Sequence, residues 1–483
     1  MARQTVRRKT FTGVGLVAGT LALSGGAWGV KEWAPFAGAA PDAPVTWPEN
    51  VQPIADYVEN VTGLQFVSPI EVEYISNDDE FAERVLGEPF VPSADDIAGA
   101  AEDDAAGRAL GLWAGDASIL DSNAAYNSGE PFPAYWLTDE NTIIINGVDG
   151  DDSLTPFARA ELALLLTQAL DDQLFGIVER IDEAPNPQAY QAAVAVASGH
   201  SLWVQNEYIA DFSDPETTRY ENAYQDRVDS FVEETSNVPG AYLALRSAGQ
   251  QLGSTFVVSL AETDPALMVQ AFTSRQPTAL DQVSLPFAKY ERFDPTEAIE
   301  PPAAPDGAEQ LYTAQLGPVG TYLLLSTGMP LTDALTASDG WGSDSYTVYR
   351  LDDTVCVDLH LIADSPDDAD RLFNGLNGWA DVRPAAAKAL VGRDGNDLYA
   401  TVCDPGTAAR QPVPTTDDVD QFYVRASYLA EQIDDTGNPE LAECIAVDTF
   451  AEFTLAELQS FDVTGDVGDA LQTIEDDCRD QVG

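Results

Sequence analysis

Basic residues are scarce in this chain of 483 residues, which has 23 Lys and Arg against 81 Asp and Glu and a formal net charge of −58. Such an acidic surface repels phosphate backbones and anionic lipid headgroups. The composition therefore excludes nucleic-acid binding, and membrane binding through a basic patch. The same charge favours solubility, including at high salt, where the self-repulsion of the surface is screened.

Residues and motifs that commonly carry catalysis are also few. The chain has two histidines, His200 and His360, in different parts of the sequence. No G-x-S-x-G elbow and no C-x-x-C pair is present, and the Gly-rich stretches lack the strand–loop–helix context of a phosphate-binding loop. His360 falls in an expected strand, "VCVDLHLIA", where a structural role is the ordinary interpretation. We therefore expect no cofactor.

The first forty residues differ from the rest of the chain. They begin with the basic stretch "MARQTVRRKT" and continue into an apolar, Gly-rich run. This pattern predicts an export signal or an N-terminal membrane anchor over residues 1–40, and hence an extracytoplasmic protein that is secreted or anchored. Cleavage and the export route, general or twin-arginine, stay open. We expect contact with a membrane only through this segment.

The four cysteines, Cys356, Cys403, Cys444 and Cys478, all lie in the last third of the chain. An even number of cysteines in an exported protein indicates disulfides, and four cysteines allow three pairings. We favour Cys356–Cys403 and Cys444–Cys478, because each of these pairings is local.

The pattern of apolar residues and turns predicts an α+β protein. A mostly helical domain is expected first, followed by a Pro-rich linker, a small α+β module and a C-terminal helical segment. The expected bounds are 50–293, 294–310, 310–405 and 415–483.

One expected helix, "LTPFARAELALLLTQALDDQLFGI", is apolar on almost every face. Thr155 is suited to cap it, Pro156 to occupy its first position and Gly176 to end it. A helix without a polar face belongs in the centre of a domain.

The same stretch resembles the active-site helix of a family of prokaryotic exported zinc-metallopeptidase-like proteins, which reads approximately L-T-P-x-x-R-x-x-L-x-H-E-L-T-H-A-L-Q-D-Q-x-F. The segment "AVAVASGHSLWVQNEYI" is similar to the second helix of that family, which carries an A-x-x-E-G-x-A motif. "GQQLGSTFVVSL" and "FTSRQPTALDQVSLP" resemble later segments, so the resemblance covers about residues 50–290. It implies a zincin-like fold for this region.

The resemblance also implies that the chemistry of the family has been lost. Two histidines at i and i+4 chelate zinc on one helix face, and the Glu between them acts as the general base. In register, these three positions are Leu164, Leu165 and Gln168, and the Glu of the second helix is replaced by Ser198. We therefore predict no bound zinc, no catalytic residues at these positions and a non-catalytic protein that binds a peptide or an envelope partner.

Two alternatives stay open. One is an active hydrolase with a relocated site that uses His200 and nearby carboxylates such as Glu207. The other is a structural envelope component without a ligand. An open cleft beside Gln168 and Ser198 would favour binding, whereas a filled one would favour a structural role.

Overall fold

The computed structural model describes residues 10–11, 46–87, 91–127, 132–147, 154–291, 299–459 and 466–482. The fold is 62% helical with two small sheets, which confirms the predicted α+β class. The expected export segment lies outside the described residues apart from the two-residue strand β1 (Thr10–Phe11). Of the expected linker 294–310, residues 299–310 are described, and strand β5 (Glu309–Ala314) begins at its end. Within the described residues, no helix combines the length and apolar character needed to cross a bilayer.

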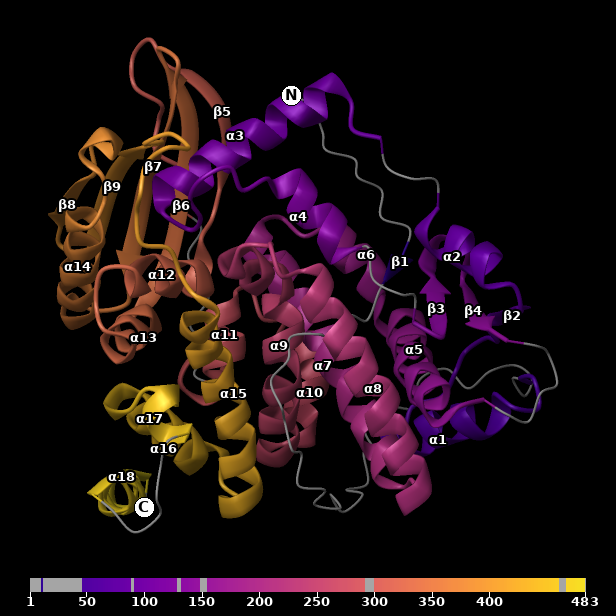
Figure 1. Cartoon of the computed structure of the whole chain (residues 1–483). Helices are drawn as coiled ribbons and strands as arrows, with labels where there is room; N and C mark the ends of the chain where they lie inside the picture. Colours follow the sequence, from indigo (N-terminus) through magenta and orange to yellow (C-terminus); the bar gives the residue numbers. More distant parts are fainter. Residues whose placement is uncertain are drawn as a thin grey trace.

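The first sheet has the strand order β1-β3-β4-β2. Strands β3 and β4 form an antiparallel hairpin around a 3₁₀ turn (η1, Thr138–Glu140), which ends at Asn141 with a left-handed φ of 50°. Strand β2 pairs with β4 in parallel. The bounds are Glu71–Ile75 for β2, Ala134–Leu137 for β3 and Thr142–Asn146 for β4, with helices α1 (Gln52–Thr62) and α2 (Asp78–Leu86) beside them (Figure 1).

Helix α5 (Pro156–Phe175) begins and ends as its sequence predicts. The side chain of Thr155 accepts a hydrogen bond from the backbone N–H of Ala158, Pro156 occupies the first turn and Gly176 closes the helix with a φ of 63°. Fourteen of its residues are buried, including Leu162, Leu166 and Leu170. This burial follows from its position between the first sheet with α1 on one side and helix α7 (Pro187–Ala210) on the other (Figure 1).

The helices that follow α5 in this region are α6 (Ile177–Asp182), α7 (Pro187–Ala210), α8 (Asp214–Glu234), α9 (Gly240–Thr263), α10 (Pro265–Phe272), α11 (Leu280–Ser284) and the π-helical turn η2 (Pro286–Glu291). Helices α6, α7 and α8 contact α5, and the remaining helices of this region pack on the other side of α7. Helices α7 and α9 cross closely at Gly199 and Gly253. A Cβ atom at Gly199 would lie 2.1 Å from the carbonyl oxygen of Gly253, so only glycine permits this approach.

The second sheet is antiparallel throughout, with the order β5-β6-β7-β9-β8. Its β6–β7 hairpin contains the strand expected around His360 and turns through Asp352 at a φ of 54°. Helices α12 (Gly317–Ser326), α13 (Leu331–Asp339) and α14 (Pro366–Asp381) accompany it, together with the 3₁₀ turn η3 (Ala385–Ala387) (Figure 1). The strands are Glu309–Ala314, Trp341–Leu351, Thr354–Ala363, Leu390–Asp394 and Asp397–Cys403 for β5 to β9.

Two helices not assigned from the sequence, α3 (Ala94–Leu110) and α4 (Ile119–Tyr126), stand in the chain between β2 and β3 of the first sheet, and α3 packs on β7 and β9 of the second sheet. The guanidinium of Arg108 donates to both carboxylate oxygens of Asp404, at 3.0 and 2.8 Å, and the indole N–H of Trp379 donates to the carbonyl of Leu110 at 2.8 Å. Helix α3 consequently lies across the second sheet, and one core contains residues from both expected domains (Figure 1).

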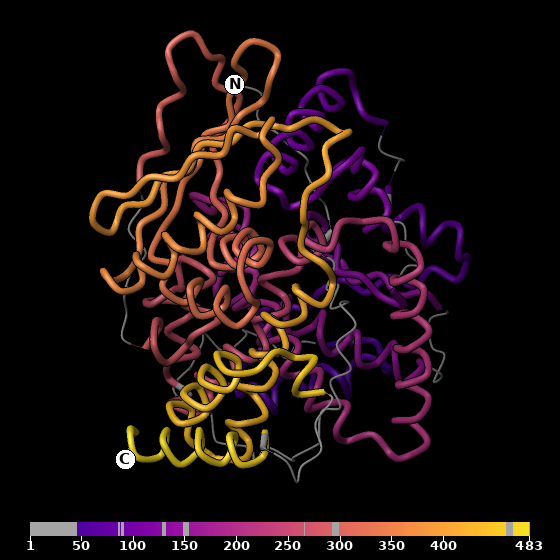
Figure 2. The backbone as a smooth tube through the Cα atoms, turned by 60° about the vertical axis from the view of Figure 1, so that its left-hand side comes forward, coloured from indigo at the N-terminus to yellow at the C-terminus, as the bar shows by residue number. Residues whose placement is uncertain are grey.

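The C-terminal segment is helical, as predicted, and consists of α15 (Thr416–Thr436), α16 (Pro439–Glu452), α17 (Leu455–Gln459) and α18 (Asp466–Val482). Figure 2 shows these helices gathered at one end of the molecule. Helix α15 packs on α9, where the hydroxyl of Tyr423 donates to the carbonyl of Ala244 at 2.8 Å. The segment is thus anchored to the helical core.

Both predicted disulfides are confirmed. Cys356 and Cys403 face each other on β7 and β9, and Cys444 and Cys478 join α16 to α18, with S–S distances of 2.04 and 2.06 Å. No free cysteine is present among the described residues. Disulfides are typical of an oxidising, extracytoplasmic environment.

Candidate functional site

The candidate site lies between α5 and α7, which run antiparallel. Polar side chains meet across this interface at three levels: Gln205 donates to Glu161 at 2.9 Å, Gln168 approaches Ser201 at 3.4 Å and His200 contacts Asp171 at 2.8 Å. None of these six side chains is more than 6% exposed. The interface is therefore a buried polar seam inside an otherwise apolar helix pair.

The four positions at which the resemblance places zinc-binding and catalytic residues are all buried. Leu164, Leu165, Gln168 and Ser198 are 3, 2, 3 and 4% exposed. Leu164 and Leu165 belong to an apolar cluster with residues of α1 and the first sheet. These side chains pack in the interior and line no open cleft.

Gln168 and Ser198 lie on the facing surfaces of α5 and α7, but Gln168 has Ser201 as its partner, one turn along α7 from Ser198. The hydroxyl of Ser198 donates to the carbonyl of Val194 on its own helix, at 2.7 Å. The side-chain oxygen of Gln168 is buried without a hydrogen-bond partner. The interface therefore leaves one polar atom of Gln168 without a hydrogen bond, which is unfavourable for a buried side chain.

His200 and Asp171 form a fully buried pair, each 0% exposed. The Nδ1 atom of His200 lies 3.0 and 2.8 Å from the two carboxylate oxygens. Burial raises the pKa of Asp171, against the opposing charges of His200 and Arg180. Since a carboxylate oxygen can only accept, Nδ1 carries the hydrogen when Asp171 is ionised.

The Nε2 atom of His200 is buried and has no hydrogen-bond partner. His200 lines a cavity of about 10 Å³ together with Thr62, Phe175, Met268 and Phe272. A cavity of this size holds about one water molecule. A histidine so enclosed can bind a water, but it has no room for a peptide.

Glu207, the carboxylate proposed beside His200, lies two turns further along α7. Its pKa is raised by burial and by the neighbouring Asp211. The contact that His200 makes is with Asp171, on α5. Asp171 could not be singled out from the sequence, because nothing local relates two residues on different helices and acidic residues abound in this chain.

Glu161 is a buried carboxyl group of the same seam. Burial raises its pKa to about 7, while the hydrogen bond from Gln205 and the charge of Arg227 act in the opposite direction. The guanidinium of Arg227 lies 4.8 Å from the ring of Phe132, and two of its nitrogen atoms are buried without hydrogen-bond partners. Such a pKa suits proton transfer at neutral pH, yet Glu161 is only 6% exposed.

His360 lies on β7, as predicted. Its Nε2 atom is 2.7 Å from a carboxylate oxygen of Asp397, and its ring stacks on Tyr399 with a centroid distance of 4.7 Å. These cross-strand contacts stabilise the sheet, in keeping with the structural role expected from the sequence.

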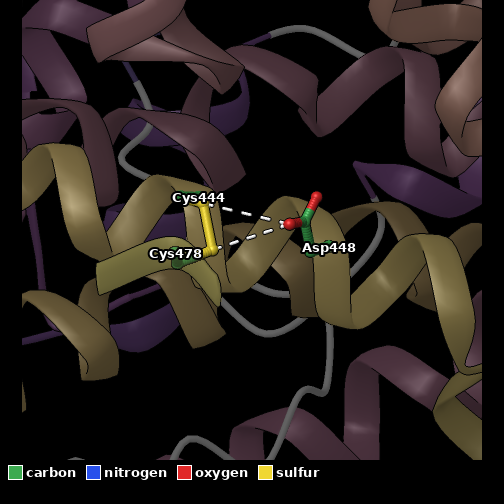
Figure 3. Close-up of side chains that lie close together, drawn as sticks. All are labelled: Cys444, Asp448 and Cys478. Atoms are coloured by element: carbon green, nitrogen blue, oxygen red, sulfur yellow. Dashed lines mark hydrogen bonds between the residues drawn. A yellow bond between two sulfur atoms is a disulfide. The ribbon is translucent and has the colours of Figure 1, made fainter. Parts of the chain in front are cut away.

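Among the described residues, one further group of potential ligands gathers at the C-terminal end. Cys444, Asp448 and Cys478 each bring a sulfur or oxygen atom within 4.8 Å of the others (Figure 3). The two sulfur atoms are joined in a disulfide, so in this oxidised form they are not metal ligands.

Comparisons with protein-family models, curated proteins and solved structures find no significant match to this chain.

Proposed function

We propose that this chain is a non-catalytic extracytoplasmic protein derived from a zinc-metallopeptidase-like family, and that it serves as a structural component of the cell envelope. Any partner, a peptide or an envelope protein, then binds to its outer surface. The observation that carries the proposal is the burial of Leu164, Leu165, Gln168 and Ser198, which are at most 4% exposed.

The chemistry of these four side chains supports the loss of the zinc site. Leu164 and Leu165 offer only carbon atoms, and the other two offer a neutral amide and a hydroxyl. Zinc in proteins is held by thiolates, imidazoles and carboxylates. A neutral, packed interior is also more stable than one that retains unpaired polar ligands.

The first experiment measures the zinc content of the full-length oxidised protein by elemental analysis. We expect no stoichiometric zinc. One equivalent of tightly bound zinc, lost when Gln168 is changed to Leu, would overturn the proposal.

The second experiment tests the register by rebuilding the site. The double variant Leu164→His/Gln168→His places two imidazoles at i and i+4 on α5, and cobalt absorption then reports binding. Adding Ser198→Glu should tighten binding further if the resemblance is in register. The matched control adds Ser201→Glu instead, because Ser201 is the residue that contacts Gln168. A gain only with Ser201→Glu would show that the register on α7 is displaced by one turn.

The contact between His200 and Asp171 is the observation that keeps the hydrolase alternative open. It predicts proteolysis of a casein-type substrate that is lost in His200→Ala and retained in Glu207→Gln. Because His200 is 0% exposed, we expect no proteolysis by the unmodified protein.

A further inference from the structure

The C-terminal disulfide has a carboxylate beside it. Cys444 and Asp448 are four residues apart on α16 and therefore share one face of that helix, and Cys478 comes from the facing helix α18. An oxygen of Asp448 lies 3.5 Å from the sulfur of Cys478 and 3.9 Å from that of Cys444 (Figure 3).

This carboxylate gains no hydrogen bond from the oxidised pair. The sulfur atoms of a disulfide carry no hydrogen, and among the described residues Asp448 makes no polar side-chain contact other than with these two atoms. Asp448 is partly buried, and its pKa is raised by burial and then by the neighbouring Asp477.

Reduction turns the same three residues into a ligand set. Two thiolates and a carboxylate, with a water in the fourth position, are suitable ligands for a tetrahedral zinc ion. The two sulfurs on zinc lie about 3.8 Å apart at a Zn–S distance of about 2.3 Å, so they must separate from their present 2.06 Å. The distances from the oxygen to the two sulfurs already resemble those of a tetrahedral site.

We propose that the reduced form of Cys444 and Cys478, together with Asp448, binds a zinc-like divalent cation, and that disulfide formation closes this site. A dithiol reductant breaks the S–S bond, supplies two electrons and two protons and is itself oxidised to a disulfide. The cation then displaces the two thiol protons and is held by two thiolates and the carboxylate. The site is independent of the helix pair α5–α7 and of its proposed function.

The other disulfide of the chain is an internal control. The carboxylate nearest in sequence to Cys356–Cys403 is that of Asp404, and both of its oxygens are held by Arg108. Among the described residues, no third ligand accompanies this pair. Reduction of Cys356–Cys403 should therefore create no comparable site.

The test uses the full-length protein, reduced anaerobically with a phosphine and titrated with cobalt(II). We expect thiolate-to-cobalt charge-transfer absorption that saturates at a single site and disappears when zinc is added. The oxidised protein should show none. The double variant Cys356→Ser/Cys403→Ser should keep the absorption of the reduced protein.

Asp448→Asn is the decisive variant, because it keeps both cysteines and can still form the disulfide. Loss of the charged ligand should weaken cobalt binding about tenfold or more. An absence of charge-transfer absorption in the reduced protein, or an unchanged affinity in Asp448→Asn, would overturn the proposal. Circular dichroism of the oxidised variant establishes that the fold is intact.

Discussion

Glu161 makes stability depend on pH in a direction opposite to that of most carboxyl groups in folded proteins. Burial raises its pKa from the ordinary 4.5 to about 7, so the folded state favours the neutral acid. The stabilising contribution of the neutral carboxyl group to the free energy of unfolding is therefore fully present below about pH 4.5 and is lost as the pH rises through 7. Replacement by glutamine, which stays neutral, should remove this dependence.

The magnitude follows from the pKa. Each pKa unit corresponds to about 1.36 kcal/mol, so ionising Glu161 in the folded protein costs up to about 3 kcal/mol above pH 7. Glu161→Gln should accordingly be more stable than the unmodified protein by up to about 3 kcal/mol at pH 8. At pH 4 the two should differ by less than about 1 kcal/mol, because an amide can still accept the hydrogen bond from Gln205.

Urea denaturation at several pH values between 4 and 8, followed by tryptophan fluorescence, measures this difference. The pKa values of Asp281 and Glu443 are also raised to about 7 by burial, so the comparison between the variant and the unmodified protein is the informative quantity. Glu221→Gln, at an exposed position on α8, is the control and should change little at any pH. Parallel stability curves for Glu161→Gln and the unmodified protein would refute the reasoning.

Three further substitutions test the packing of α5 and α7 against their neighbours by urea denaturation at a single pH. Leu165→Ala should lower the free energy of unfolding by about 3 kcal/mol, because Leu165 is 2% exposed and its truncation leaves a buried cavity. A loss below about 1 kcal/mol would indicate an open cleft at this position. Gln168→Leu should stabilise the protein by about 1 kcal/mol, since the amide oxygen has no hydrogen-bond partner and the contact with Ser201 is 3.4 Å long. Destabilisation would mean that this contact is stronger than its length suggests. Gly199→Ala should lower the free energy of unfolding by about 2 kcal/mol, because the added Cβ would lie 2.1 Å from the carbonyl oxygen of Gly253. A neutral effect would show that α7 and α9 can separate freely.

Elements with strong local chemistry could be predicted from the sequence. The N-cap of α5 at Thr155 rests on a side chain that bonds to the backbone three residues away, and Gly176 ends the helix in the left-handed conformation that glycine favours. The β3–β4 and β6–β7 hairpins follow from apolar runs interrupted by polar turns. Both disulfides followed from the proximity of their cysteines in the chain.

Helix α3 could not be predicted in the same way. Its sequence, ADDIAGAAEDDAAGRAL, consists mostly of small residues and acids and has no apolar stripe. The helix is held instead by partners distant in the sequence, such as Asp404 for Arg108 and Trp379 for the carbonyl of Leu110. Such contacts have no counterpart in local periodicity.

The sequence by itself determined that α5 is a capped, buried helix with Leu164, Leu165 and Gln168 in its middle turns. Only the tertiary structure decided what surrounds them: an interface in which Asp171 pairs with His200 and Gln168 meets Ser201. The physical reason is that capping and apolar patterning act within one helix, whereas the partners of a buried polar group are selected by the packing of another helix against it.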